Sequence, residues 1–149
     1  MYTVPAVKRE LASNSMIYTR FRTAIDNGKL QVRHPTDAFL AEVDKSSEAV
    51  GDIRFLSQVD KQVLALALEL KSLGENSLIV TDDYSIQNVS NQLGLEFTPL
   101  MTFGIRYRLN WTIYCPACHR QYPPDHKMKT CQACGTELKR KAIRRTPLR

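Results

Sequence analysis

The chain has 149 residues, 43% of them hydrophobic, and a formal net charge of +6. This length allows one ordinary domain with a real core, or a smaller domain plus a mini-module. No apolar run approaches the roughly 18–20 residues that a membrane span needs, which excludes a membrane-spanning protein. The N-terminus has no signal-peptide pattern.

The charge is unevenly distributed along the chain. Residues 1–100 contain ten Lys and Arg against thirteen Asp and Glu, a net charge of −3. Residues 101–149 contain eleven Lys and Arg, and their only acids are Asp125 and Glu137, a net charge of +9. An acidic body with a basic C-terminal third favours a polyanionic partner, most simply nucleic acid. The alternative is a solvated charged tail that aids solubility.

The first fifty residues read as helices with one short strand. Pro5 suits the first position of a helix, and we expect helices over residues 6–12 and 15–25. A turn at Asp26-Asn27-Gly28 precedes a short strand over residues 30–33. Thr36 can cap a further helix over residues 37–50, which Gly51 would end.

The next fifty residues alternate helix and strand. Ser57 and Asp60 have the spacing of a capping box, and the following helix is apolar on nearly all sides up to Gly74, as in a buried helix. Residues 78–81 then form a continuous apolar run, typical of a buried parallel strand. A helix ending at Gly94 and a last strand over residues 97–105 complete the pattern. The sequence therefore predicts an α/β fold, with a parallel sheet flanked by helices.

All four cysteines lie in the basic third, in two Cys-x-x-Cys pairs: Cys115 and Cys118, then Cys131 and Cys134. Twelve residues separate the pairs, and four thiolates so arranged can close a tetrahedral structural Zn²⁺ site. A c-type haem attachment at the first pair, or a thioredoxin-like redox pair, would leave the other pair unexplained. Thiols used as metal ligands indicate a reducing compartment, so we expect a cytoplasmic protein. We expect a linker near residues 105–111, a zinc module over about residues 110–138 and a loosely ordered basic tail.

The acidic residues offer a second metal site. Asp82 and Asp83 directly follow the buried strand, at the kind of sheet edge where open α/β folds bind ligands. Their oxygens suit Mg²⁺ or Mn²⁺, but a helix cap explains them equally well. Asp60 has the same two readings, and Glu10 alone reads as a surface acid. Together these acids could form a metal-bound phosphodiesterase centre. The sequence contains no Gly-rich phosphate loop, no Ser-His-Asp set and no cysteine nucleophile.

Basic and aromatic residues alternate from position 106 onward. Cations contact phosphates, and rings such as Trp111 and Tyr114 can stack on unpaired bases or simply pack the zinc module against the body. The predicted RNA-binding residues are Arg106, Arg108, Arg120, Lys127, Lys129, Lys139, Arg140 and Lys141.

Two sequence strings carry a resemblance to a known family. The segments Leu56–Ala67 and Val80–Val89 (VTDDYSIQNV) resemble a PIN-domain nuclease. The second segment, joined to the two cysteine pairs and to Leu138–Lys141, is similar to the NIN-one-binding (Nob) ribosome-maturation endonucleases in their short archaeal form. Tyr2–Leu11 and Gly51-Asp52 match as well, so the resemblance covers essentially the whole chain.

The resemblance implies a metal-dependent endoribonuclease that forms the mature 3′ end of small-subunit rRNA. It implies Mn²⁺ or Mg²⁺ at an acidic centre containing Glu10, Asp60 and Asp83, with Asp82 assisting, and a zinc ribbon that contacts rRNA. The expected partners are small-subunit rRNA, the precursor of the small ribosomal subunit and assembly factors. The expected units are a PIN-like domain over residues 1–105, a zinc ribbon over 106–138 and a basic tail over 139–149.

The chain departs from the family at its start. The family opens with a central strand ending in Asp, and residues 1–149 begin after it. A start site upstream of Met1 and a chain without catalysis would both explain this departure. The main alternative function is therefore a non-catalytic, zinc-ribbon rRNA-binding assembly or ribosomal protein. A zinc-ribbon transcription accessory protein would leave the TDDYSIQNV string unexplained.

Overall fold

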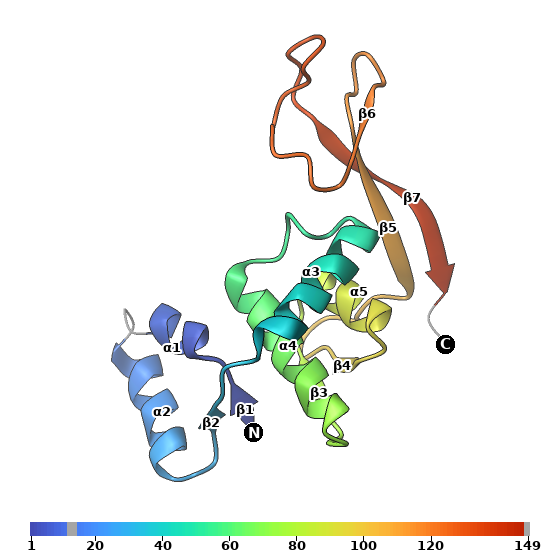
Figure 1. Cartoon of the computed structure of the whole chain (residues 1–149). Helices are drawn as coiled ribbons and strands as arrows, with labels where there is room; N and C mark the ends of the chain where they lie inside the picture. The colour runs from blue at the N-terminus through green and yellow to red at the C-terminus, as the bar shows by residue number, and fades with distance from the viewer. Residues whose placement is uncertain (12–14, 148–149) are drawn as a thin grey trace.

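The computed structural model describes residues 1–11 and 15–147 (Figure 1). Two sequence predictions extend beyond them: the last residue of the helix over 6–12, and the end of the tail at 148–149. In chain order the elements are β1 (Tyr2–Thr3), α1 (Pro5–Leu11), α2 (Ser15–Asp26), β2 (Gln31–Val32), α3 (Asp37–Val50), α4 (Gln58–Ser72), β3 (Leu78–Val80), α5 (Tyr84–Gln92), β4 (Glu96–Thr98), β5 (Tyr107–Tyr114), β6 (Gln121–Tyr122) and β7 (Lys139–Pro147).

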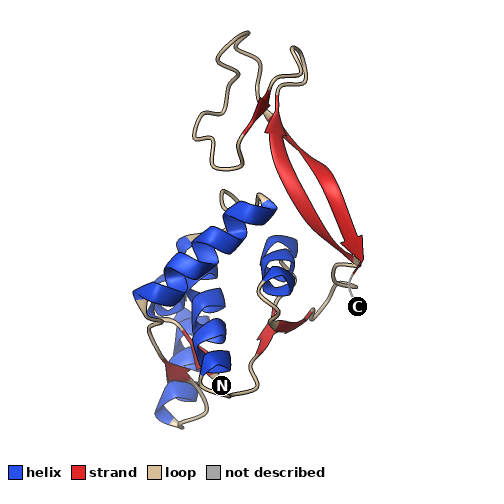
Figure 2. Ribbon diagram, turned by 45° about the vertical axis from the view of Figure 1, so that its right-hand side comes forward, coloured by secondary structure: helices blue, strands red, loops and turns tan. Residues whose placement is uncertain are grey.

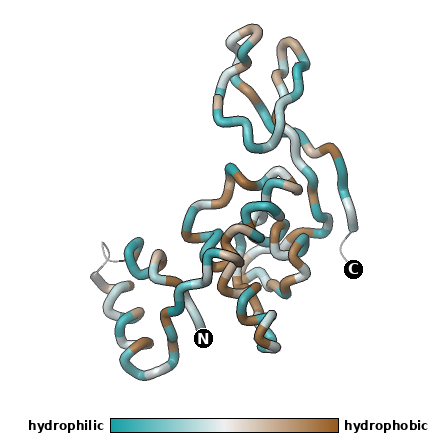
Figure 3. Tube along the Cα trace, viewed as in Figure 1, coloured by the Kyte–Doolittle hydropathy of each residue, from teal (hydrophilic) through white to brown (hydrophobic). Residues whose placement is uncertain are grey.

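The core of the body forms around α4. This helix starts with the predicted capping box, in which the Asp60 amide donates to the Ser57 hydroxyl and the Ser57 amide donates to the Asp60 carboxylate. Leu64 is fully buried, in a cluster that includes Val43 and Val50 of α3 and Val89 of α5. Apolar residues are accordingly concentrated in α4 and the elements around it (Figure 3). The nearly all-round apolar pattern of α4 thus produces a central helix, as expected.

The β2–α3 junction is fixed by a charged side chain of α4. Glu69 is only 7% exposed, and its carboxylate accepts from the Arg33 guanidinium at 2.8 Å and from the Thr36 amide at 2.9 Å. A buried carboxylate needs such partners to compensate for the loss of hydration. This contact sets where α3 begins.

The parallel strands of the body lie in two separate pairs. β1 pairs with β2, and β3 pairs with β4, both in parallel. A cavity of about 520 Å³ lies between β1 and β3, over the apolar side chains of α4. Only Ile79 of β3 is buried, while Leu78 and Val80 are 55% and 52% exposed. The prediction of a buried strand is therefore correct only for Ile79, because the cavity leaves one edge of β3 without a neighbouring strand.

The C-terminal third is built on two long antiparallel strands, β5 and β7. They form a hairpin whose connecting segment contains β6 and the cysteine loops. β5 and β7 pair antiparallel from Tyr107 opposite Pro147 to Tyr114 opposite Lys139, with one irregularity at Asn110/Trp111, and β6 pairs with the other edge of β5. Figure 2 shows this hairpin rising beside the helices, with the cysteine-bearing loops beyond its far end.

Three sequence predictions for this region are corrected by the hairpin. The basic segment is not a loose tail, because residues 139–147 form β7 and pair with β5. The expected linker over 105–111 enters β5 at Tyr107. The last body strand ends at Thr98, before Pro99, instead of continuing to Ile105. Proline lacks the amide hydrogen that a sheet ladder needs, which accounts for the early end.

Across residues 1–11 and 15–147, every helix is too short or too polar to traverse a lipid bilayer.

Candidate functional site

The four cysteines meet at the far end of the hairpin. All four Sγ atoms lie within 4.8 Å of one another, with 3.4 Å between Cys115 and Cys134 and 3.5 Å between Cys118 and Cys131. Thiolates at about 2.3 Å from a tetrahedral zinc ion would lie about 3.8 Å apart, so this set fits such an ion. With all four positions taken by sulfur, an ion here would be structural.

Neighbouring groups stabilise the thiolate of Cys131. The Tyr122 hydroxyl lies 3.0 Å from Cys131 Sγ and accepts from the Gln132 amide at 3.2 Å. This hydroxyl is the main reason that the pKa of Cys131 falls to about 6, because a donor favours the charged thiolate. The residues after the two pairs, His119 and Gly135, both adopt positive φ, at 60° and 73°. The two loops therefore turn alike, although only one has the glycine that this conformation favours.

Asp82 supports a loop of the body. Its carboxylate accepts from the amides of Leu100, Met101 and Thr102 at 3.0–3.2 Å, and from the Thr102 hydroxyl at 3.1 Å. These bonds, with that from Met101 first, lower the pKa of Asp82. Asp82 therefore holds the loop that follows β4, and its predicted part in catalysis stays a prediction.

Asp60 and Asp83 both cap helices. Asp60 Oδ2 accepts from the Ser57 amide at the start of α4, and Asp83 Oδ1 accepts from the Ser85 amide at the start of α5. The helix-cap interpretation is thus correct for both residues. Since these bonds use one oxygen of each carboxylate, the other oxygen remains for a cation.

The acids do not form a closed metal site in this structure. Glu10 is exposed on α1, Asp60 lies in the first turn of α4, and Asp83 precedes α5. Among the described residues, the cysteines alone bring three or more potential ligand atoms within 4.8 Å of one another. The oxygen donors suit Mg²⁺ or Mn²⁺ chemically, but their arrangement here does not by itself enclose such an ion. Their role as a metal centre stays a prediction.

A buried carboxylate that was not among the predicted site residues lies between the body and the hairpin. Asp52 is 1% exposed, and it accepts from Asn88 Nδ2 at 2.5 Å and from Arg140 at 3.2 Å. Burial raises the pKa of Asp52 to about 6, and the nearby Asp83 charge adds to the rise, while Asn88 and Arg140 oppose it. The sequence signal was only the Gly51-Asp52 pair, which no periodicity or spacing connects to a partner 88 positions away.

Arg140 joins the hairpin to the body. Its guanidinium lies 3.8 Å from the centroid of the Phe55 ring and 4.3 Å from that of Trp111, in addition to its ion pair with Asp52. A planar guanidinium is suited to ring stacking and carboxylate pairing at once. Arg140 thus has a structural contact that the sequence did not predict, and its RNA contact stays a prediction.

The polar residues of the TDDYSIQNV string fix the path of the chain into β5. Gln87 donates to the Thr81 carbonyl and accepts from the Ile105 amide, both at 2.9 Å. Asn88 exchanges two hydrogen bonds of 2.7 Å with the backbone of Leu109. Both side chains are buried and satisfied, so they attach β5 to α5.

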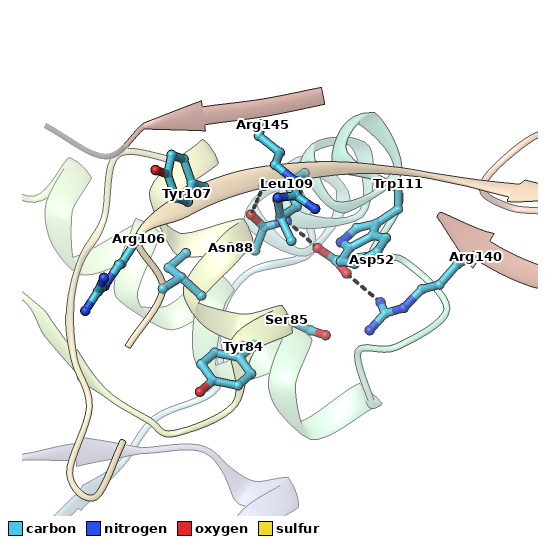
Figure 4. A pocket seen from close by; sticks show the side chains of 11 residues that line it. Asp52, Tyr84, Ser85, Asn88, Arg106, Tyr107, Leu109, Trp111, Arg140 and Arg145 are labelled. Carbon is cyan, nitrogen blue, oxygen red and sulfur yellow. Dashed lines mark hydrogen bonds and ion pairs between the residues drawn. The ribbon is translucent and has the colours of Figure 1, made fainter. Parts of the chain in front are cut away.

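A cavity of about 460 Å³ opens between α5 and the hairpin. Figure 4 shows Tyr84 and Ser85 on α5 at one side of it and Tyr107 and Leu109 on β5 at the other, with Arg106 at one end and Trp111 and Arg140 at the other. The cavity therefore combines rings, cations and the buried Asp52, and its lining residues Tyr84 and Ser85 directly follow Asp83 in the chain.

The other predicted RNA-binding residues lie along the hairpin and its loops. Arg106, Arg120, Lys127, Lys129, Lys139 and Lys141 are exposed, and Lys141 Nζ lies 5.0 Å from the Tyr114 ring centroid. Arg108 is half-buried, and its Nε has no hydrogen-bond partner among the described residues. The structure leaves six of these cations available to solvent, and their contacts with RNA stay predictions.

Comparisons with known proteins agree with this architecture. A family profile described as "PIN domain of ribonuclease" matches residues 1–70. "Endoribonuclease Nob1" of Methanothermobacter thermautotrophicus is 34% identical over 144 residues, covering 96% of this chain and 82% of that protein. "Endoribonuclease Nob1" of Methanocaldococcus jannaschii is 36% identical over 143 residues, covering 96% and 68%. "Ribonuclease VapC1" of Thermoplasma acidophilum is 39% identical over 111 residues, covering 74% and 54%.

Proposed function

The chain belongs to the Nob1 family of endoribonucleases, and we propose that it cleaves precursor small-subunit rRNA to form the mature 3′ end during ribosome biogenesis. The observation that carries this proposal is the similarity to proteins named Endoribonuclease Nob1 over 96% of the chain, from the PIN-like body through the cysteine pairs. A match to the nuclease domain alone would not have distinguished this family from other PIN ribonucleases.

In this proposal the acids Glu10, Asp60 and Asp83 hold Mn²⁺ or Mg²⁺ and the phosphate to be cleaved. Mg²⁺ is usually held by one or two carboxylates together with waters and substrate phosphates, instead of by a full protein cage. Within the described part of the chain, one oxygen of Asp60 and one of Asp83 are used in helix caps, and a second oxygen on each is consistent with this mode of binding. Such an ion would supply charge stabilisation at the phosphate, and the carboxylates would orient it.

The proposal gives the C-terminal third a binding role. Zn²⁺ at the four cysteines would hold the loops in place, and the exposed cations of the hairpin would contact rRNA phosphates. The net charge of +9 over residues 101–149 supports this division of roles, because phosphate contacts dominate RNA affinity. The proposed binding partners are small-subunit rRNA and the precursor of the small subunit, with a cytoplasmic location.

The test separates cleavage from binding. The whole chain is incubated with Mn²⁺ and an RNA spanning the 3′ end of small-subunit rRNA, beside Asp83→Asn. We expect the variant to lose cleavage by at least about 100-fold, the scale of losing a transition-state contact, while its RNA affinity changes by less than about 3-fold. Asp37→Asn, which removes an exposed acid in the first turn of α3, is the matched control and should cleave normally.

The same assay distinguishes the endoribonuclease from a non-catalytic RNA-binding protein. The separation of the acids in this structure favours a non-catalytic rRNA-binding assembly protein as the second candidate. Tight binding by the whole chain, with no Mn²⁺- or Mg²⁺-dependent cleavage, would support that candidate. If Asp83→Asn lost RNA affinity and cleavage equally, Asp83 would have no specific role in the cleavage step.

A further inference from the structure

The cavity between α5 and the β5–β7 hairpin is large enough for part of an RNA strand. Its volume of about 460 Å³ falls within the range of pockets that hold small ligands, roughly 300–1,000 Å³. It is also open to solvent on the side of Tyr84 and Tyr107, whose side chains are 56% and 48% exposed. We propose that this cavity binds one unpaired nucleotide of the RNA substrate, an inference that rests on the proposed function.

Aromatic side chains provide the surface for the base. Tyr84 on α5 and Tyr107 on β5 both line the cavity, and their elements lie on opposite sides of it (Figure 4). Tyr84 and Tyr107 are 56% and 48% exposed, so part of each ring is open to solvent and offers a flat face on which an unpaired base can stack. Stacking contributes about 1–3 kcal/mol per base and tolerates any base, because every base has a π face.

Two arginines provide the contacts for the phosphate. Arg106 lies at one end of the cavity, and Arg145 of β7 also lines it. Both are exposed, and among the described residues neither has an ion pair. Arg140, by contrast, already pairs with Asp52, which neutralises the one buried carboxylate of the cavity. The remaining positive charge favours an anionic ligand and excludes a cationic one.

The position of the cavity connects it with the proposed chemistry. Tyr84 and Ser85 line it, and they directly follow Asp83. A nucleotide stacked on Tyr84 would therefore position the neighbouring phosphate close to Asp83, so the cavity would select a flexible, single-stranded cleavage site.

Trp111 allows binding in the cavity to be measured directly. It is the only tryptophan of the sequence, and it lines the cavity beside Arg140. The probe is a five-nucleotide single-stranded RNA, titrated into the whole chain without Mn²⁺ or Mg²⁺ and without chelator, so that neither cleavage nor loss of bound metal interferes. We expect a saturable change in tryptophan fluorescence and weaker binding of a longer RNA duplex that stays fully paired under the same conditions.

The variants test the stacking surface. Tyr84→Ala and Tyr107→Ala should each weaken binding by about 5- to 150-fold, whereas Tyr84→Phe should bind nearly as the wild type does. Tyr18→Ala on α2, outside the cavity, is the aromatic control. Far-ultraviolet circular dichroism establishes that each variant is folded.

Three results would overturn the inference: unchanged affinity in both tyrosine-to-alanine variants, equal binding of double-stranded RNA, or a fluorescence change with hexaglutamate but not with RNA. The last result would indicate an acidic peptide site. Because no catalytic metal is present, these measurements stand apart from the cleavage assay. The chain can fail to cleave and still bind a nucleotide here, or cleave without using the cavity.

Discussion

At the scale of single residues, Asp52 has the most unusual environment in the body. It is an ionisable group with 1% exposure, and its charge is balanced by one arginine from a strand far along the chain. A buried ion pair of this kind contributes less to stability than to fixing one arrangement of the groups that meet there. Here it fixes β7 against the end of α3.

Asp52 predicts how stability depends on pH. Its pKa is about 6 in the folded chain and 3.8 in an ordinary environment, so between these values the folded state binds more protons than the unfolded state. The free energy of unfolding should therefore fall as pH rises from about 4 to 6, by roughly 2–3 kcal/mol, and then remain level with respect to this group. Asp52→Asn should lack this pH dependence when both chains are unfolded with urea at pH 4, 5, 6 and 7.

Parallel pH profiles for the wild type and Asp52→Asn would contradict that expectation. Asp26→Asn serves as the control, since the Asp26 side chain is 67% exposed on α2. Its profile should follow that of the wild type, because exposed ion pairs contribute little.

At the scale of elements, the join between α3 and β5 depends on Gly51. Its φ of 79° is a left-handed conformation, and a Cβ there would lie 2.4 Å from the Trp111 carbonyl oxygen. Gly51→Ala should therefore destabilise the chain by about 3 kcal/mol, the sum of backbone strain and overpacking. Gly28→Ala is the matched control, because Gly28 has a similar φ of 68° but no atom within 4 Å of its Cβ position. It should cost about 1 kcal/mol, and equal losses for the two variants in urea unfolding would count against this packing.

The helices show what could be predicted from the sequence. The bounds of α3 and the capping box of α4 agree with the prediction, because both depend on local signals: a cap, an apolar period and a terminal glycine. The alternation of the helices with short parallel strands was also predicted. The four cysteines were predicted as one cluster because their spacing alone restricts the possible geometry.

The elements that were missed depend on contacts distant in sequence. β7 is rich in Lys and Arg and is typical of a solvated tail, but pairing with β5, whose residues lie 25 to 40 positions earlier, makes it a strand. Arg140, the partner of Asp52, lies on that same strand. The ion pair could therefore not be predicted without first predicting β7. The division of the body into two strand pairs likewise follows from tertiary structure, since each strand has only two or three residues.

At the scale of the whole molecule, the body and the cysteine loops should fold with some independence. Among residues 1–11 and 15–147, the core around Leu64 contains no residue of the hairpin. The cluster of Ile113, Tyr122, Cys115 and Cys131 belongs to the C-terminal third alone. That second cluster is too small to hold the loops without a metal.

Replacing one ligand should therefore unfold the loops and spare the body. Cys131→Ser should lose bound zinc, measured by elemental analysis, and should become sensitive to trypsin at Lys127 and Lys129. Its helical circular dichroism should stay within about 10% of the wild type, because the helices pack on the body core. Lys45→Ala, a substitution at an exposed position of α3, is the control. A variant that resists trypsin and chelators as the wild type does would show that the loops need no metal.

A nuclease that forms the mature 3′ end of small-subunit rRNA must cut the precursor at one place. The most direct measurement is to sequence the ends of the RNA fragments that the whole chain produces, with Mn²⁺, from a precursor spanning the mature 3′ end. We expect a single cut at that end, which disappears in Asp83→Asn. Cuts scattered along the precursor, or a cut that persists in Asp83→Asn, would contradict it.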